Sequence, residues 1–276
     1  MQLLAAALLF STGGAAIKAV TLTSWQVAGF RSAIAAVVLL ALLPEARRNW
    51  SKRTGLVSIA YAATLVLFVL ANKLTTAANA IFLQASAPVY LVLLGPWLLK
   101  EKPQRRDWWT LAVICCGMAL FFAGAEAPRI TAPDPRGGNL LAAGAGLSWA
   151  LTLGGLRWIA GKSGDQDGGL ATVAGGNCLA ALVCLPMALP VAASTSLDWL
   201  VVSYLGIFQI GLAYLLLTRG VRGVPALEVS LLIMLEPALN PVWTWLVHGE
   251  APGFYSIGGG ALILAATVRR GITARR

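Results

Sequence analysis

Charged side chains are scarce in this chain. Asp, Glu, Lys and Arg make up 12% of the 276 residues, whereas hydrophobic residues make up 58%. A soluble globular domain is usually about 25% charged, so most of this surface must face lipid or other apolar helices. The connections between the apolar runs are short, and none is long enough for a separate soluble domain. The sequence therefore predicts an all-α polytopic membrane protein.

Residues that serve enzymes and metal sites are also few. The one histidine, His248, is expected in a loop, and neither HExxH nor GxSxG occurs. A membrane hydrolase would need a buried nucleophile with a base, or a pair of acids within reach of each other. The four cysteines lie inside apolar runs without any CxxC spacing, so we interpret them as packing residues. The sequence indicates a protein that is not an enzyme and has no metal site.

The net charge of +10 has a simpler explanation than nucleic-acid binding, because the basic residues sit in short loops between apolar runs. Most of them fall in the connections on one side of the membrane, at 44–53, 100–106, 157–162, 219–222 and 269–276. The other side carries Lys18, Lys73, Arg129 and Arg136. Because Lys and Arg accumulate in cytoplasmic loops, we expect both termini in the cytoplasm of a bacterial cell, with the chain in the inner membrane.

Runs of about 20 apolar residues, enough to cross a bilayer core, occur ten times. They fall near 2–20, 24–44, 54–72, 76–98, 107–124, 139–159, 168–190, 198–217, 226–247 and 254–269. The first run lacks a basic stretch before it and has Lys18 after it. It is therefore interpreted as a membrane span and not as a signal peptide.

The chain contains an internal repeat. "NAIFLQASAPVYLVLLGPWLLKEKP" at 79–103 matches "VSLLIMLEPALNPVWTWLVHGEAP" at 229–252, with Pro88, Glu101 and Pro103 falling 149 residues before Pro237, Glu250 and Pro252. "LLAAALLFS" at 3–11 likewise resembles "LLAAGAGLS" at 140–148. We divide the chain into a repeat at 1–125, an extracytoplasmic linker at 126–138 and a second repeat at 139–276.

Each repeat contains five spans, an odd number, so the two must enter the membrane from opposite sides. Inverted repeats with interrupted helices and a site between the halves are the architecture of many secondary transporters. An inert scaffold or a receptor would not need this arrangement. The glycine count of 29 fits close helix packing, although a scaffold would also use it.

The doubled proline and glutamate pattern, the repeated "LLAA" opening and "FRSAIAAVVLLALL" with Arg31 resemble the drug/metabolite transporter superfamily, specifically its ten-span EamA-type members. The order of features is similar to the YddG-type exporters of aromatic and other neutral amino acids. The resemblance implies a basket of helices around a central cavity open to one side at a time, with no bound cofactor. The expected partners are a small-molecule substrate and the lipid bilayer, without nucleic acid, and the protein is expected to be a monomer or a weak homodimer.

The repeat separates scaffold positions from cargo positions. Prolines and glutamates that both halves share are expected to build or gate the scaffold, with Glu250 hydrated or paired with a nearby cation. Polar residues of only one half are expected to serve the cargo. With the same offset, Gln84 falls on an isoleucine, Glu236 on Ala87 and Asn240 on Leu91. Polar groups at such depths must face protein or water and not lipid.

An amino acid needs a group for its carboxylate, a group for its ammonium and a wall for its side chain. Arg31 is a candidate for the carboxylate, although it could instead pair with Glu236 or extend to the surface. Glu236 is a candidate for the amine or for proton coupling, or for a structural hydrogen bond. The wall candidates are Tyr61, Tyr90, Trp149, Tyr214 and Trp243.

The complete set of candidates follows. The predicted substrate-binding residues are Ser11, Arg31, Tyr61, Asn79, Gln84, Tyr90, Trp149, Asn177, Gln209, Tyr214, Glu236 and Asn240. The predicted hinges are Pro88, Pro237 and Pro241. Phosphorylated cargo would favour several buried cations, and a small multidrug-type antiporter would favour an acid in the first span, which has none. We expect an exporter of amino acids, with other small metabolites or drug-like compounds as the alternative.

Overall fold

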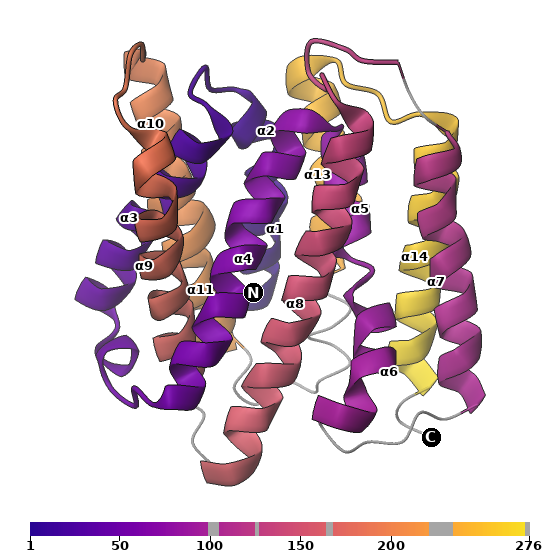
Figure 1. The fold of residues 1–276 in the computed structure, drawn as a ribbon, viewed down its shortest axis with the longest axis horizontal. Coiled ribbons are helices and arrows are strands. Elements are labelled where there is room, and N and C mark those ends of the chain that lie inside the picture. The colour runs from indigo at the N-terminus through magenta and orange to yellow at the C-terminus, as the bar shows by residue number, and fades with distance from the viewer. Residues whose placement is uncertain (99–104, 125–126, 164–167, 221–233, 274–276) are drawn as a thin grey trace.

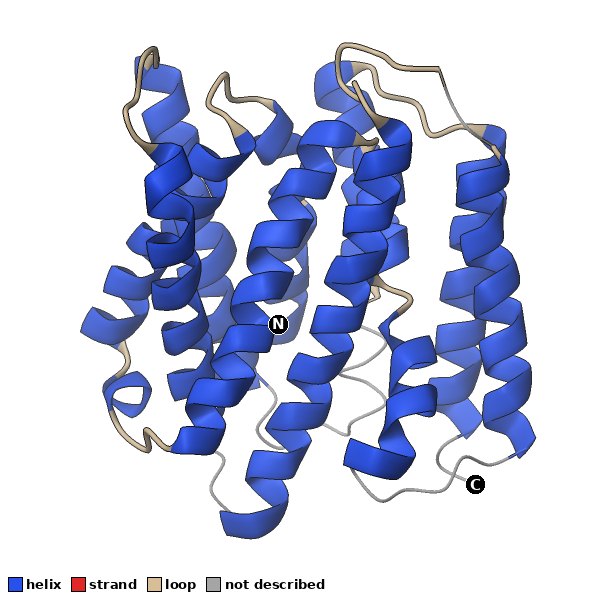
Figure 2. Ribbon diagram, in the orientation of Figure 1, coloured by secondary structure: helices blue, strands red, loops and turns tan. Residues whose placement is uncertain are grey.

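The computed structural model describes residues 1–98, 105–124, 127–163, 168–220 and 234–273. Glu101 and Pro103 of the repeat, the start of the ninth predicted span and residue 126 of the predicted linker lie outside these ranges. The described residues form helices and no strand, apart from an isolated bridge between Arg129 and Ala132 (Figure 2). Helices suit this apolar chain because a helix satisfies its backbone groups internally, as lipid requires.

The helices follow the apolar runs. They are α1 (Gln2–Ser11), α2 (Gly13–Lys18), α3 (Ser24–Leu42), α4 (Lys52–Leu74), α5 (Ala77–Gln84), α6 (Ala87–Leu98), α7 (Arg105–Ala123), α8 (Pro135–Ser163), α9 (Gly168–Ala188), α10 (Ser196–Tyr204), α11 (Ala213–Gly220), α13 (Leu235–His248) and α14 (Phe254–Thr273). A 3₁₀ turn, η1 (Pro44–Arg47), precedes α4, and a π-helical segment, η2 (Leu205–Leu212), joins α10 to α11.

Six stretches within the described residues are long and apolar enough to cross a membrane, and three shorter apolar helices accompany them. These nine coincide with nine of the ten predicted spans. The remaining predicted span, at 226–247, is described only from residue 234 and contains α13. The protein is therefore an all-α polytopic membrane protein, as the sequence predicts.

Helices of the two predicted halves interlock. In the first half, α3 packs against α9 and α4 packs against both α8 and α9, all from the second half. At the opposite edge α7 lies along α14 (Figure 1). The connections at 19–23, 127–134, 189–195 and 249–253 gather at one end of the molecule, which we call the outer end because the charge pattern predicts it to be extracytoplasmic.

Glycines allow these helices to approach closely. A Cβ added to Gly155 in α8 would lie only 2.5–3.2 Å from side-chain atoms of Val57 in α4. Val57 cannot swing away easily, because a β-branched side chain is stiff at χ1. Gly55, also in α4, has no atom within 4 Å of such a Cβ.

We therefore expect Gly155→Ala to destabilise the fold by about 1–3 kcal/mol, the usual cost of overpacking. Gly55→Ala should be neutral or slightly stabilising, because alanine is the better helix former. Thermal unfolding of the purified protein in detergent measures both. Equal unfolding midpoints for the two variants would contradict the close α4–α8 packing.

Candidate functional site

The first predicted span is interrupted at Thr12, where α1 ends and α2 begins. The hydroxyls of Ser11 and Thr12 donate to the carbonyls of Leu8 and Leu9, each at 2.7 Å. These bonds satisfy carbonyls that the end of a helix leaves free. The indole of Trp243, from α13, donates to Ser11 Oγ at 2.9 Å. The interruption is thus joined to a helix of the second half.

Two glycines follow the interruption, and each meets an amide side chain. A Cβ on Gly13 would lie 2.8 Å from Gln209 Nε2, and a Cβ on Gly14 would lie 3.0 Å from Asn240 Nδ2. Asn240 is fully buried, yet among the described residues neither atom of its amide has a hydrogen-bond partner, and Gln209 Oε1 also lacks one there. Because buried polar groups are normally hydrogen-bonded, these amides are suited to receive a polar ligand.

Arg31 lies in the middle of α3, and only 2% of its surface is exposed. Its Nη2 donates to the carbonyl of Leu65 at 3.1 Å, and its Nε has no partner in the described ranges. The guanidinium also interacts electrostatically with Tyr61 and Tyr214. The structure excludes extension of Arg31 to the surface, and it shows no ion pair between Arg31 and Glu236. Arg31 has no carboxylate partner within the part of the chain that the structure describes. A buried cation without such a partner is costly, so an anion is the natural ligand here.

Aromatic rings surround this region. Tyr61 in α4 packs edge-on against Tyr214 in α11, with ring centroids 5.9 Å apart. Tyr61 also lies 6.4 Å from Trp149 in α8, and Tyr214 lies 5.2 Å from Phe10 in α1. The structure thus brings together three of the predicted wall residues, from three different helices.

Glu236 lies in the first turn of α13, partly buried. It interacts electrostatically with the phenols of Tyr61 and Tyr214, the same pair that Arg31 approaches. The positive end of a helix dipole stabilises a carboxylate in the first turn. Arg31 in α3 and Glu236 in α13 form no ion pair with each other.

A second interruption separates α5 from α6 at residues 85 and 86. Gln84 ends α5, and Tyr90 lies in α6; both are partly buried. The predicted hinge Pro88 follows this break and occupies the first turn of α6. Pro237 likewise lies in the first turn of α13, where a proline costs little, whereas Pro241 is buried inside α13.

We call Arg31, Tyr61, Gln209, Tyr214, Glu236 and Asn240 the central residues and the region around them the central site. Asn79 does not join them. Its amide bonds Asn139 Oδ1 at 3.1 Å and accepts from Ser256 Oγ at 2.6 Å, in a network at the outer end. Asn177 is fully buried in α9, donates to the carbonyl of Val173 and has an unpartnered Oδ1. His248 is the last residue of α13 and contacts the carbonyl of Ala15, so its predicted place in a loop is wrong.

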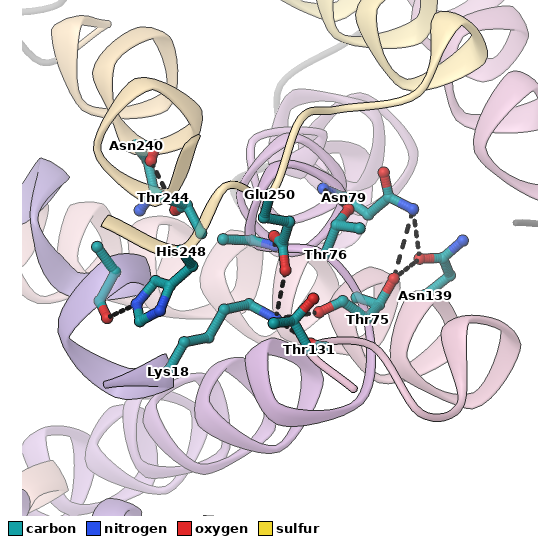
Figure 3. Close-up of polar contacts among 12 residues, drawn as sticks. Lys18, Thr75, Thr76, Asn79, Thr131, Asn139, Asn240, Thr244, His248 and Glu250 are labelled. Atoms are coloured by element: carbon teal, nitrogen blue, oxygen red, sulfur yellow. Dashed lines mark hydrogen bonds and ion pairs between the residues drawn. The ribbon is translucent and has the colours of Figure 1, made fainter. Parts of the chain in front are cut away.

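The sequence did not point to the partner of Glu250. Lys18 forms an ion pair with Glu250 at 3.0 Å, and both side chains are buried (Figure 3). The prediction that Glu250 could pair with a nearby cation is consistent with this contact. Lys18 had been interpreted only as a loop charge, because its partner is 232 residues away and no local pattern links the two.

Comparisons with known proteins agree with this architecture. The pattern of the EamA-like transporter family matches residues 1–123 and 136–269. The chain is 25% identical over 257 residues to the threonine/homoserine exporter RhtA of Escherichia coli (strain K12), covering 91% of this chain and 82% of that protein. It is 24% identical over 270 residues to the pseudopaline exporter CntI of Pseudomonas aeruginosa (strain UCBPP-PA14), covering 94% and 90%.

One crystal structure superposes on the chain with a TM-score of 0.64, over 98% of this chain and 96% of the other, at 20% sequence identity. Identity at this level supports a shared fold and carries no information about cargo.

Proposed function

Because the chain belongs to the EamA-like transporter family, we propose that it exports small zwitterionic metabolites, neutral amino acids above all, across a bacterial inner membrane. Transport would proceed by alternating access between two inverted halves, with both termini in the cytoplasm. The names of the relatives RhtA and CntI support the outward direction and a small cargo. The positive-inside pattern of the loops supports the orientation.

One observation carries the choice of a zwitterion: Arg31 is buried in α3, Glu236 is partly buried in α13, and the two form no ion pair with each other. The carboxylate of an amino acid would bind Arg31, and its ammonium would bind Glu236. Charge-assisted hydrogen bonds of this kind are roughly twice as strong as neutral ones. Gln209, Asn240 and the Ser11 hydroxyl would bind further polar groups of the cargo.

The aromatic residues bear on the size of the cargo side chain. Tyr61 packs against both Trp149 and Tyr214, so the three side chains leave less room for a large ring than for a short side chain. Threonine and homoserine, the cargo in the name of one relative, are of the smaller kind. The preference for aromatic amino acids that the sequence suggested remains a prediction to be tested beside them.

Trp149→Ala should shift selectivity toward large amino acids. Removing the indole opens space, so the ratio of tryptophan to threonine flux should rise by about tenfold, as one pocket contact usually gives. Trp245→Ala is a suitable control, because Trp245 is an exposed tryptophan of α13. A ratio that is unchanged in Trp149→Ala and Trp245→Ala alike would remove Trp149 from the site.

Ligand-induced stabilisation tests the proposed cargo class. A ligand that binds the folded protein raises its stability by about 1.4 kcal/mol at ten times its dissociation constant. We expect threonine, homoserine or another neutral amino acid to raise the unfolding midpoint of the wild type but not of Arg31→Met. If no amino acid shifts the midpoint and an unrelated metabolite does, the cargo belongs to another class.

A further inference from the structure

The outer end contains a buried ion pair that the central site does not use. Lys18 Nζ and Glu250 lie 3.0 Å apart, and their side chains are only 3% and 2% exposed (Figure 3). Lys18 ends α2 in the first predicted half. Glu250 follows α13 in the second. The pair therefore joins the two halves directly at one end of the molecule.

Each partner also binds backbone groups. Glu250 Oε1 accepts from the N–H of Ala77, in the first turn of α5, at 2.7 Å. Lys18 Nζ donates to the carbonyl of Thr75 at 2.8 Å and to that of Thr131, which precedes α8. Four segments thus meet at one salt bridge.

Polar side chains continue from this point into a network. Asn139 Oδ1 accepts from Thr75 Oγ1 at 2.8 Å and from Asn79 Nδ2 at 3.1 Å, and Asn139 Nδ2 donates to the carbonyl of Phe121 at 2.9 Å. Ser256 Oγ donates to Asn79 Oδ1 at 2.6 Å. The network extends the contact to α7, α8 and α14. The ends of helices from both halves are therefore held together.

We propose that the Lys18–Glu250 ion pair is a gate, which closes the outer end of the protein and must break to release cargo; this inference rests on the proposed transport function. A gate has to have two states of similar free energy. A buried ion pair meets this condition, because the cost of desolvating both charges nearly cancels their attraction. When the end opens, water solvates both ions again.

Asp198, a second buried carboxylate at the outer end, is held in a different way from Glu250. Asp198, in the first turn of α10, is 1% exposed and accepts from the N–H and the hydroxyl of both Thr21 and Thr195, at 2.6–2.8 Å. It caps its own helix and binds the loop after α2 through uncharged groups. Asp198 keeps its contacts in both the closed and the open state, whereas the Lys18–Glu250 ion pair breaks when the outer end opens.

The gate lies at the ends of two helices that also carry cargo candidates. In α5, Ala77 binds the gate and Gln84 lies at the other end, about 10 Å away at 1.5 Å per residue. In α13, Glu236 and Asn240 lie before His248, and Gly249 then turns the chain with φ 64° so that Glu250 can reach Lys18. A shift of either helix on cargo binding would change the distance between Lys18 and Glu250.

A reporter cysteine tests the gate without any cargo. Thr244 lies on α13 between Asn240 and His248 and is 1% exposed. We would introduce Thr244→Cys after replacing the four native cysteines with alanine, and follow its reaction with a membrane-impermeant thiol reagent in purified protein. Lys18→Met and Glu250→Gln should each speed labelling by about tenfold, equal to 1.4 kcal/mol of population shift. Glu250→Gln keeps an oxygen for the Ala77 N–H and removes only the charge.

The double variant should label no faster than the faster single variant, because both changes break one contact. Lys73→Met is the matched control: Lys73 is also at the outer end, but it donates to the Val20 carbonyl. It should leave the rate unchanged.

If the single variants fail to fold, Glu250→Asp keeps the charge on a shorter side chain and should still speed labelling. Unchanged rates in folded variants, or equal acceleration by Lys73→Met, would overturn the gate.

The two proposals can fail separately. Accelerated labelling in a protein that moves no amino acid would support the gate and refute the proposed cargo. Amino-acid flux in the wild type, together with unaccelerated labelling in the variants, would refute the gate alone.

Discussion

Asn240→Ala should reduce amino-acid flux by about tenfold or more while leaving the stability of the empty protein unchanged or higher. Both atoms of the Asn240 amide are buried and have no partner among the residues that the structure describes, so alanine removes none of the described hydrogen bonds that hold the fold. It does remove an unsatisfied polar group, whose burial costs about 1–3 kcal/mol. If the amide binds cargo, Asn240→Ala also loses about the same free energy, about 1–3 kcal/mol, from cargo binding.

Asn72→Ala provides the matched control. Asn72 is as deeply buried, in α4, and its Oδ1 also has no partner among the described residues, but its Nδ2 donates to the Phe68 carbonyl at 2.9 Å. Alanine there should lower stability by about 1 kcal/mol and should leave flux nearly intact once equal amounts of folded protein are compared. The opposite pattern, with Asn240→Ala unstable but active, would assign Asn240 to the scaffold.

Arg31→Met should have the larger effect, a loss of flux of about 100-fold. A hydrogen bond to a charged group contributes about 1.5–3 kcal/mol, and the guanidinium would hold the cargo carboxylate with two. Arg31→Lys should restore little, because an ammonium cannot reproduce the planar fork. Stability should not fall much in Arg31→Met, since methionine replaces a buried cation whose one described hydrogen bond goes to the Leu65 carbonyl.

Arg53→Met separates this effect from a general loss of positive charge. Arg53 stacks on Trp158, with its guanidinium carbon 4.7 Å from the ring centroid, and it has no place in the central site. Both side chains are partly exposed, and a cation–π contact outside a desolvated site contributes only about 0.5–1 kcal/mol, so flux should stay within about twofold of the wild type. A transporter that tolerates Arg31→Met but not Arg53→Met would contradict the assignment of Arg31 to the cargo.

Much of the fold could be predicted because lipid imposes simple rules on the sequence. Apolar length gives the spans. The interruptions were harder to place. The sequence predicts a hinge at Pro88; α5 ends four residues earlier, at Gln84, and the proline lies in the first turn of α6, where its missing N–H is not needed. A proline in the sequence therefore indicates that a helix break is near, but not whether the break lies before or after the proline.

The central residues could be predicted from the sequence for a similar reason. Arg31, Gln209 and Asn240 are polar groups in apolar runs, and polar groups at that depth must face protein or water. Asn79 satisfied the same rule but belongs to the outer network, because depth does not tell which neighbours a side chain meets. The Lys18–Glu250 contact depends on packing across 232 residues, which local pattern does not encode.

The most direct test of the transport account is the flux of labelled threonine, homoserine, phenylalanine and tryptophan in proteoliposomes of purified protein, with and without a pH gradient. Saturable flux that unlabelled amino acids compete away, and that Arg31→Met abolishes, is the expected result. Dependence on the gradient would assign Glu236 to proton coupling, and independence would make the protein a facilitator. No flux of any amino acid through folded wild-type protein would contradict the account and direct the search to another metabolite.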